Sequence, residues 1–468
     1  MALDTILKSS LFKNYDVRGE YGLDLTEETV FLIARAFVRF SGAKRVVIGS
    51  DARLSSPVLS KALIEGLRSL GVAVEDLGLV STDVLYFAVW HGGYDGGIMV
   101  TASHMPGKYN GMKFLRLNDK GVLDPIGRGL GMEELEAIAR SDDFVLSSRE
   151  KGGMAAAKTA SYKKIDLWKD YVSFVRNFAD TKLIRGLTVV MDAGNGMGGL
   201  VAERVFAGFD IKIIKLFFEP DGNFPNHDPN PLVPKNREAI MAAVREHRAD
   251  LGIAWDADCD RCFFIDEKGD FIHGDFIAAL LAIQFLKKEK GAGIVYDLRA
   301  SKVVQNWIDK LGGKGYIERV GHTYIKPKMR ETVSVFGGEM SGHYYFSANK
   351  YMDNGFIPAL IMMEILAKEK RPLSEIISSL GEYHISGEVN FRVSDISSVF
   401  KKMEEMYPDA RLEKTDGLSV SYPDWHFNVR PSANEPLLRL NLEAGTAELF
   451  KEKFKEVSAL IGGERYDD

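Results

Sequence analysis

The residues most able to do chemistry stand in one short stretch, Asp256-Ala-Asp-Cys-Asp-Arg261. Three of them, Asp256, Asp258 and Asp260, follow an apolar run over residues 251–254 that predicts a buried strand. Alternate residues of an extended chain lie about 7 Å apart on one face, and a loop can draw them closer. Such carboxylates repel one another unless they are protonated or neutralised, and a hard divalent cation is the usual partner. The stretch therefore predicts a metal site, with a solvated acidic turn as the alternative.

A second candidate is a serine in a tight loop. Residues 101–113 follow the apolar run 97–100, and Pro106 and Gly111 break any regular element there. We expect Ser103 at the carboxyl edge of a sheet, where α/β folds place their ligands. Taken alone, the loop is equally compatible with a serine that bonds its own backbone in a turn.

Residues 337–343 form a third polar loop. Glu339, Ser341 and His343 stand at alternate positions between glycines that let a ligand approach the backbone. Carboxylate, hydroxyl and imidazole groups suit sugar hydroxyls, which both donate and accept hydrogen bonds. An ordinary polar turn is the alternative.

The fourth loop lies between the expected strands 427–429 and 437–442. Its Arg430, Ser432 and Asn434, together with backbone amides, suit a phosphate group. The alternative is a proline-bounded hairpin turn with solvated arginines.

Other interpretations of the carboxylate stretch are weaker. Asp256, Asp258, Asp260 and Glu267 occupy positions 1, 3, 5 and 12 of a calcium EF-hand loop, but Arg261 stands where that loop has glycine. The stretch also resembles the haloacid-dehalogenase phosphotransferases, whose first aspartate is the nucleophile, although Asp260 departs from their pattern.

The two cysteines form a lone CxxC pair. Cys259 and Cys262 have no second pair to complete a zinc site, and the nearby carboxylates disfavour the thiolate that a redox pair needs. We interpret them as small packing thiols.

Residues 194–199 fit the pattern GxGxxG of dinucleotide-binding folds, and Glu219 follows twenty residues later. A dinucleotide-binding module is therefore an alternative. Asp192 argues against it, because its carboxylate would repel a pyrophosphate.

The elements that must position these loops alternate between strand and helix. The strand 46–49 ends at Asp51, a helix follows with Ser56 as N-cap and Pro57 as its first residue, and the strand 72–74 comes next. Strands 187–191 and 293–296 restart the pattern and end at Asp192 and Asp297. This succession predicts three related α/β units with mostly parallel sheets.

The last part of the chain differs. Residues 387–393 alternate like a half-exposed antiparallel strand, and a final helix runs from Thr446 as N-cap to Gly462. We expect an α+β domain here, and place the domains at residues 1–153, 154–270, 271–375 and 376–468.

Composition narrows the class of protein. The 468 residues are 46% hydrophobic and 27% charged, which is typical of a globular chain with several cores. The net charge of −6 argues against a nucleic-acid partner bound through a basic face. Apolar runs such as 276–283 are shorter than the ~20 residues of a membrane span, and the N-terminus lacks a secretory segment. We expect a cytoplasmic protein with no membrane partner.

The four loops in this order, together with Phe12-Lys-Asn-Tyr-Asp-Val-Arg-Gly19, resemble the α-D-phosphohexomutase family over essentially the whole chain. That family interconverts sugar 1- and 6-phosphates. The resemblance implies four domains around a central cleft, three with a mixed α/β core and a more mobile fourth. It also implies hexose phosphate substrates, one Mg²⁺ ion, and a hexose 1,6-bisphosphate that serves as intermediate and primer.

The resemblance assigns roles to residues. It makes Ser103 a phosphoserine whose phosphate binds Mg²⁺ together with Asp256, Asp258 and Asp260. Glu339 and Ser341 would hold sugar hydroxyls. Arg430, Ser432, Asn434 and Arg439 would hold the non-reacting phosphate. Proton transfer or transition-state support falls to Arg18, Lys113 and His343, and the other matching positions are Tyr15, Arg261, Arg299, His322 and Lys326.

Within the family, residues 15–18, 321–326 and 339–343 resemble the phosphomannomutase/phosphoglucomutase type, and phosphoglucosamine mutase is the alternative. A non-catalytic sugar-phosphate-binding protein is the alternative of another class. Met105, Ala257, Cys259 and the pair Ala433-Asn434 depart from the family pattern. A monomer or dimer is expected.

Overall fold

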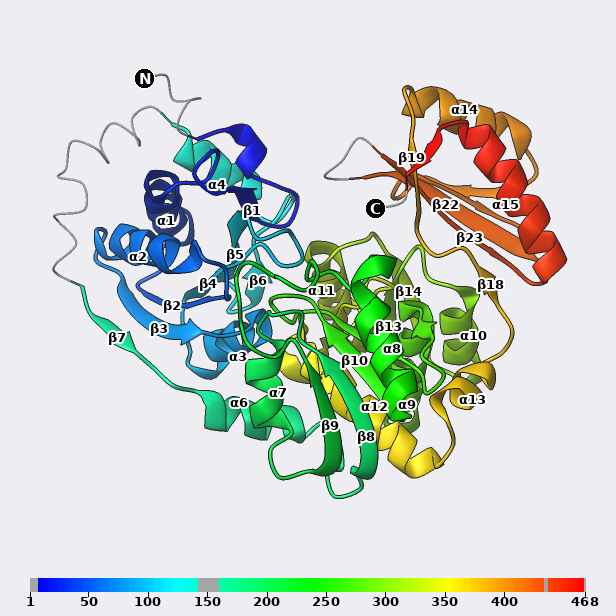
Figure 1. Ribbon diagram of the computed structural model, residues 1–468. Helices are drawn as coiled ribbons and strands as arrows, with labels where there is room; N and C mark the ends of the chain where they lie inside the picture. The colour runs from blue at the N-terminus through cyan, green and yellow to red at the C-terminus, as the bar shows by residue number, and fades with distance from the viewer. Residues whose placement is uncertain (1–6, 142–159, 433–436, 467–468) are drawn as a thin grey trace. The chain divides into compact units, whose positions relative to one another are not determined.

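The computed structural model describes residues 7–141, 160–432 and 437–466. The chain forms two compact units: residues 1–271 with 343–370, and residues 272–342 with 371–468 (Figure 1). Among the described residues, no helix is long and apolar enough to cross a membrane.

The first sheet of unit 1 is mixed. β2 (Arg45–Ser50) lies parallel to β3 (Ala73–Leu79) and to β4 (Gly96–Val100), and β4 is antiparallel to β5 (Tyr109–Leu117). α1 (Glu27–Ser41) and α2 (Ser56–Arg68) bury apolar residues against one face, and α3 (Thr82–His91) packs on the other. The sheet also includes β1 (Val17–Glu20), β6 (Leu123–Pro125) and β7 (Tyr162–Lys164), with η2 (Ser9–Leu11) and α4 (Met132–Ala139) beside it.

The predicted cap of α2 is wrong by one residue. Ser55 is the N-cap, Ser56 is the first helical residue, and Pro57 is the second. The reason is that the Ser56 hydroxyl donates a hydrogen bond to Asp51, 2.9 Å away, so it does not cap the helix.

The second sheet repeats this design. β8 (Arg185–Asp192) lies parallel to β9 (Asp210–Leu216) and β10 (Leu251–Trp255), and β10 is antiparallel to β11 (Cys262–Ile265). The Trp255 ring stacks on Phe356 of α12 (Phe356–Glu369), with 4.9 Å between centroids. The remaining elements of unit 1 are α6 (Trp168–Arg176), α7 (Gly198–Val205), η4 (Pro234–Arg237), α8 (Glu238–His247), β16 (Tyr344–Phe346), η5 (Ser347–Asn349) and β17 (Met352–Asp353).

Unit 2 contains the third repeat. β13 (Gly293–Asp297) lies parallel to β14 (Lys314–Glu318) and to β15 (Ser334–Gly338). Its helices are α9 (Gly274–Lys288), α10 (Lys302–Lys310), α11 (His322–Glu331) and α13 (Leu373–Ser378). The strand β12 (Phe271–Ile272) precedes them in the chain and belongs to the second sheet, next to β11. In all three repeats the leading strand ends in an aspartate, or next to one, and its parallel neighbour delivers a candidate loop.

The last sheet is antiparallel and has the order β20-β21-β22-β23-β19-β24. α14 (Ile396–Met406) and α15 (Ala447–Ile461) cover one face with a buried apolar cluster, and Thr446 caps α15 as predicted. The strands are β18 (His384–Ile385), β19 (Val389–Arg392), β20 (Arg411–Glu413), β21 (Leu418–Ser421), β22 (Trp425–Pro431), β23 (Leu438–Ala444) and β24 (Glu464–Tyr466). The predicted fold class, three mixed α/β sheets and an α+β part, is confirmed.

The opposite face of β22 and β23 is polar. The register places Arg430 opposite Arg439, Asn428 opposite Asn441, and His426 opposite Glu443. Because alternate residues of a strand share a face, these three pairs form one continuous polar row.

Candidate active site

The serine loop begins at the carboxyl end of β4. Ser103 is buried, its backbone has a φ of +51°, and its amide donates to the Thr101 hydroxyl at 2.9 Å. Thr101 in turn donates to Asp51 at the end of β2, 2.7 Å away. The aspartate that ends the leading strand therefore anchors the loop that the neighbouring strand delivers.

Arg53 holds the same loop from within. Its side chain is fully buried, and its two Nη atoms donate to four carbonyl oxygens, those of Ser103 (2.6 Å), Met105 (2.7 Å), Pro106 (2.8 Å) and Tyr109 (2.9 Å). The Nε atom donates to Asp51 at 3.1 Å. Residue 105 contributes a backbone carbonyl, which any residue can supply. The departure of Met105 from the family pattern therefore leaves this hydrogen bond of the loop intact.

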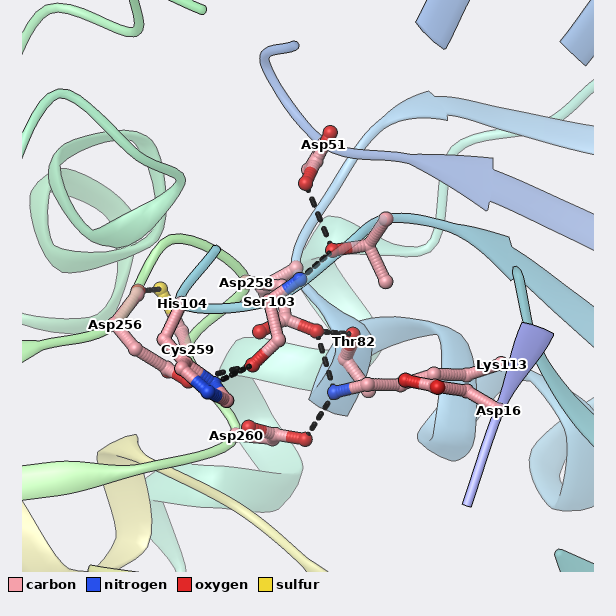
Figure 2. Close-up of polar contacts among 12 residues, drawn as sticks. Asp16, Asp51, Thr82, Ser103, His104, Lys113, Asp256, Asp258, Cys259 and Asp260 are labelled. Carbon is pink, nitrogen blue, oxygen red and sulfur yellow. Dashed lines mark hydrogen bonds and ion pairs between the residues drawn. The ribbon is translucent and has the colours of Figure 1, made fainter. Parts of the chain in front are cut away.

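The metal loop joins β10 to β11 and lies against the serine loop (Figure 2). Asp256, Asp258 and Asp260 are fully buried, and each offers an oxygen within 4.8 Å of the others. The Ser103 hydroxyl donates to Asp256 at 3.0 Å. The folded chain thus brings the predicted serine and the predicted carboxylates into direct contact.

Lys113, on β5, is the cation of this cluster. Its ammonium donates to Asp258 at 2.7 Å and also to Asp260 (Figure 2). Burial alone would lower the pKa of Lys113, but the charges of these two carboxylates outweigh it and raise the pKa well above its ordinary value. Lys113 is therefore charged.

The pKa values of Asp256 and Asp260 are shifted in opposite directions. Burial, with the charges of Asp260 and Asp258, raises the pKa of Asp256 well above its ordinary value. Burial would also raise the pKa of Asp260, but the Lys113 ammonium outweighs it and lowers the pKa. Within the described residues, one oxygen each of Asp258 and Asp260 is buried without a hydrogen-bond partner. Orphan carboxylate oxygens in an all-oxygen set fit a hard divalent cation.

A histidine and an arginine adjoin the cluster. The Arg261 Nε atom donates to His343 Nε2 at 3.0 Å, and His343 Nδ1 lies 3.0 Å from a carboxylate oxygen of Asp353. Since Nε2 accepts, Nδ1 carries the proton and donates it to Asp353. His104 lies beside Ser103, with its Nδ1 at 3.2 Å from the hydroxyl, and burial holds its pKa well below the ordinary value.

The glycine pattern of residues 194–199 serves packing. A Cβ atom on Gly196 would lie 2.6 Å from the backbone of Ala257, and one on Gly199 would lie 2.2 Å from the Phe218 carbonyl. The amides of Gly196 and Met197 donate to backbone carbonyls, as does that of Asn195, while that of Gly194 donates to Asp192. Four of the six amide donors of residues 194–199 are therefore already used, and the Met197 amide and the close approach of Gly196 support the metal loop at Ala257.

Both cysteines are free and fully buried, as expected for packing thiols. Cys259 has a φ of +60°, a conformation that favours glycine.

Two further candidate residues, Arg18 and Tyr15, lie near the N-terminus. Arg18 on β1 pairs with Asp16, and its Nε atom is buried without a hydrogen-bond partner among the described residues. Tyr15 is half-buried in the bend before β1.

Unit 2 places a second group of predicted residues together. Arg299 follows β13 and donates to Asp297 at 2.9 Å, and its guanidinium lies 3.9 Å from Glu339. Glu339 accepts from the Gly321 amide at 2.8 Å, at the start of α11. His322 and Lys326, on the first turns of α11, are buried, and Ser341 is half-buried.

The candidate phosphate loop also lies in unit 2. Arg430 is the next-to-last residue of β22 and Arg439 the second residue of β23. Both donate to Glu388, at 3.1 and 2.8 Å. Ser432 is half-buried, and Asn434 lies outside the described residues, as does Ala433.

Sequence reasoning missed four residues that organise these groups: Asp51, Arg53, Asp353 and Glu388. A signal existed for the first two. Asp51-Ala-Arg53 and Asp297-Leu-Arg299 repeat the pattern Asp-x-Arg after an apolar strand, and in both the arginine Nε atom donates back to the aspartate.

Comparisons with known proteins agree with this geometry. Family models of phosphoglucomutase/phosphomannomutase alpha/beta/alpha domains I, II and III match residues 9–129, 169–269 and 273–383. The chain is 39% identical over 461 residues to a phosphomannomutase of Escherichia coli, which covers 96% of this chain and 98% of that protein. A protein of Xanthomonas campestris pv. campestris described as "Phosphohexose mutases" is 39% identical over 456 residues, covering 97% and 99%.

Among solved structures, a phosphoglucomutase/phosphomannomutase family protein from Burkholderia thailandensis superposes with a TM-score of 0.84 and 33% identity. The alignment covers 98% of this chain and 99% of that one. The likeness thus extends beyond the three matched domains to the C-terminal sheet.

Proposed function

Because the chain belongs to the phosphoglucomutase/phosphomannomutase family and is therefore a hexose-phosphate mutase, we propose that Ser103 carries the phosphoryl group. The observation that supports this role is the placement of the Ser103 hydroxyl, 3.0 Å from Asp256 and in the same cluster as the Lys113 ammonium. A phosphate on Ser103 would lie between this cation and three potential metal ligands.

The proposed cycle has two transfers. In the first, the bond between phosphorus and Ser103 Oγ breaks, a sugar hydroxyl forms the new bond, and its proton passes to a nearby base. The product is a hexose 1,6-bisphosphate, which must reorient before its other phosphate returns to Ser103. Mg²⁺ held by Asp256, Asp258 and Asp260 would offset charge on the transferring group.

The surrounding residues have distinct proposed tasks. Lys113 neutralises the serine oxygen as the phosphoryl group leaves, and His343, held in one tautomer by Asp353, can receive or return the hydroxyl proton at Nε2 once Arg261 releases it. Arg18 would support the transferring phosphoryl group.

The remaining assignments concern the substrate. Glu339 and Ser341 would hold sugar hydroxyls, and Arg430, Ser432, Asn434 and Arg439 the phosphate that does not react. Tyr15, Arg261, Arg299, His322 and Lys326 complete the proposed substrate contacts. Mannose and glucose phosphates are the proposed substrates.

The decisive test replaces Ser103 by alanine. The full chain is assayed with Mg²⁺, a hexose 1,6-bisphosphate primer, and the 1-phosphates of mannose, glucose and glucosamine. Ser103→Ala should lower turnover by several orders of magnitude and abolish the phosphopeptide of this loop in a mass spectrum. Ser141→Ala is the control, because that hydroxyl is exposed and donates to a backbone carbonyl, that of Ile138. Full turnover by folded Ser103→Ala would exclude the proposed role.

The domain boundaries, the cellular location and the oligomeric state are also proposals. We place the domain boundaries near residues 153, 270 and 375, of which the first lies outside the described residues. A cytoplasmic location fits the two free thiols, which a reducing compartment preserves. A monomer or dimer is testable by light scattering.

A further inference from the structure

Three arginines of unit 2 surround one carboxylate. The Oε1 atom of Glu388 accepts from Arg439 at 2.8 Å. Its Oε2 atom accepts from both Arg430 and Arg299, each at 3.1 Å. These guanidinium groups come from the ends of β22, β23 and β13, so a single side chain gathers three separate elements.

This carboxylate occupies the kind of position that an anionic ligand would take. Guanidinium groups that converge on one point are the usual recognition device for phosphate. Arg430 is buried, and its Nε atom has no hydrogen-bond partner among the described residues, so part of its fork is still available. Arg299 is already neutralised by Asp297, whereas the positions of Arg430 and Arg439 opposite each other on β22 and β23 concentrate like charge.

Glu388 cannot yield its place by taking up a proton near neutral pH. Burial would raise its pKa, but the three arginines outweigh it and lower the pKa to about 2. It can leave by moving, because 24% of its side chain is exposed and it follows Gly387, whose φ is +63°. A phosphate dianion beside a charged Glu388 would be repelled, so the two anions exclude one another.

We propose that Glu388 is an internal counter-anion that neutralises the arginines of the phosphate loop and is displaced when a phosphate group binds. This inference rests on the proposed function of residues 430–439. In this role Glu388 weakens phosphate binding and so favours release of the sugar phosphate. The proposed cycle requires such release, because the enzyme must rebind its intermediate in a second orientation.

The test measures the affinity of the full chain for inorganic phosphate by calorimetry, without Mg²⁺, so that the acidic cluster of unit 1 repels the anion. Glu388→Gln should bind phosphate about tenfold more tightly, because a negative charge at contact distance is removed from a partly solvated site. Glu388→Asp, which keeps the charge on a shorter side chain, should lie between the two.

The control is Glu382→Gln. It makes the same change of net charge in the same segment, but Glu382 is exposed and pairs only with His384 among the contacts in the described chain, so affinity should stay within about twofold. Weaker or unchanged phosphate binding by Glu388→Gln would overturn the inference. If Glu388→Gln does not fold, weaker or unchanged binding by Glu388→Asp would overturn it in the same way.

A further variant separates the two proposals. Arg430→Lys should weaken phosphate binding at least tenfold if residues 430–439 form the phosphate site. If Arg430→Lys has no effect, the site assignment fails. If Arg430→Lys weakens binding and Glu388→Gln does not tighten it, only the inference about Glu388 fails.

Discussion

Replacement of Arg53 tests whether the serine loop depends on one buried guanidinium. In Arg53→Met, four carbonyl oxygens lose the guanidinium that donates to them, and Asp51 loses one of its several donors. Each charge-assisted hydrogen bond contributes about 1.5–3 kcal/mol, but the sum is not additive, and water replaces part of it. Breaking a buried pair by removing one partner costs about 3–5 kcal/mol, and we expect a loss in this range.

Arg53→Lys gives the sharper measurement. It keeps the charge but removes the planar fork, so the loop should persist with a displaced Ser103. A displacement of about 1 Å lowers turnover on the order of 100-fold, and we expect this in kcat with KM changed less than threefold. Thermal midpoints by circular dichroism and a coupled mutase assay measure the two effects, with a fall in midpoint on the order of 10 °C for Arg53→Met.

The control is Arg128→Met, which removes a guanidinium that also donates to a backbone carbonyl, that of Phe12, but is 30% exposed. Its loss should be about 1 kcal/mol or less. A folded Arg53→Lys with unchanged kcat would refute the reasoning that Arg53 positions Ser103.

Three further predictions concern unit 1. Lys113→Met should lower turnover more than 100-fold and tighten Mg²⁺ binding about tenfold, since two carboxylates lose a competing cation; turnover assays and metal titration by calorimetry measure both. Burial raises the pKa of Asp83 to about 7, so its contribution to stability is complete below pH 4 and is lost as pH rises through 7. Asp83→Asn should therefore gain up to about 4 kcal/mol relative to the parent between pH 4 and pH 7, measured by thermal unfolding. Gly196→Ala should weaken Mg²⁺-dependent turnover at least tenfold through the backbone of Ala257, and titration should show no NAD binding by the parent.

Each of these has a matched control or a contrary result. Lys108→Met, on the same loop but exposed, should leave Mg²⁺ binding unchanged. Stability curves of Asp83→Asn and the parent that run parallel with pH would contradict the assigned titration. Gly445→Ala should be neutral, because its nearest neighbour would lie 3.5 Å from the new Cβ atom.

The place of the candidate residues in the fold follows from the sequence where one strand delivers one loop. Asp256, Asp258 and Ser103 follow apolar runs that can only be buried strands, and their place at a sheet edge follows from that pattern. Composition does not predict that these residues contact one another in the tertiary structure. That expectation came from the resemblance to a family.

The missed residues act across long stretches of chain. Arg53 contacts carbonyls about fifty positions away, and a backbone carbonyl leaves no trace in the sequence. In the sequence, Glu388 is one polar residue of an alternating segment. The three arginines that donate to it lie far away along the chain, at the ends of other strands. The prediction of Ser56 as a cap fails for a local reason, because its hydroxyl bonds to Asp51, five residues earlier in the chain.

The ammonium of Lys113 has a consequence for the life of the protein in a cell. It joins β5 of the first sheet to the loop after β10 of the second, so the serine and metal loops are fastened by a side chain that is present from synthesis. We therefore expect the serine and metal loops to stay in contact, and unit 1 to stay folded, when divalent cations are scarce.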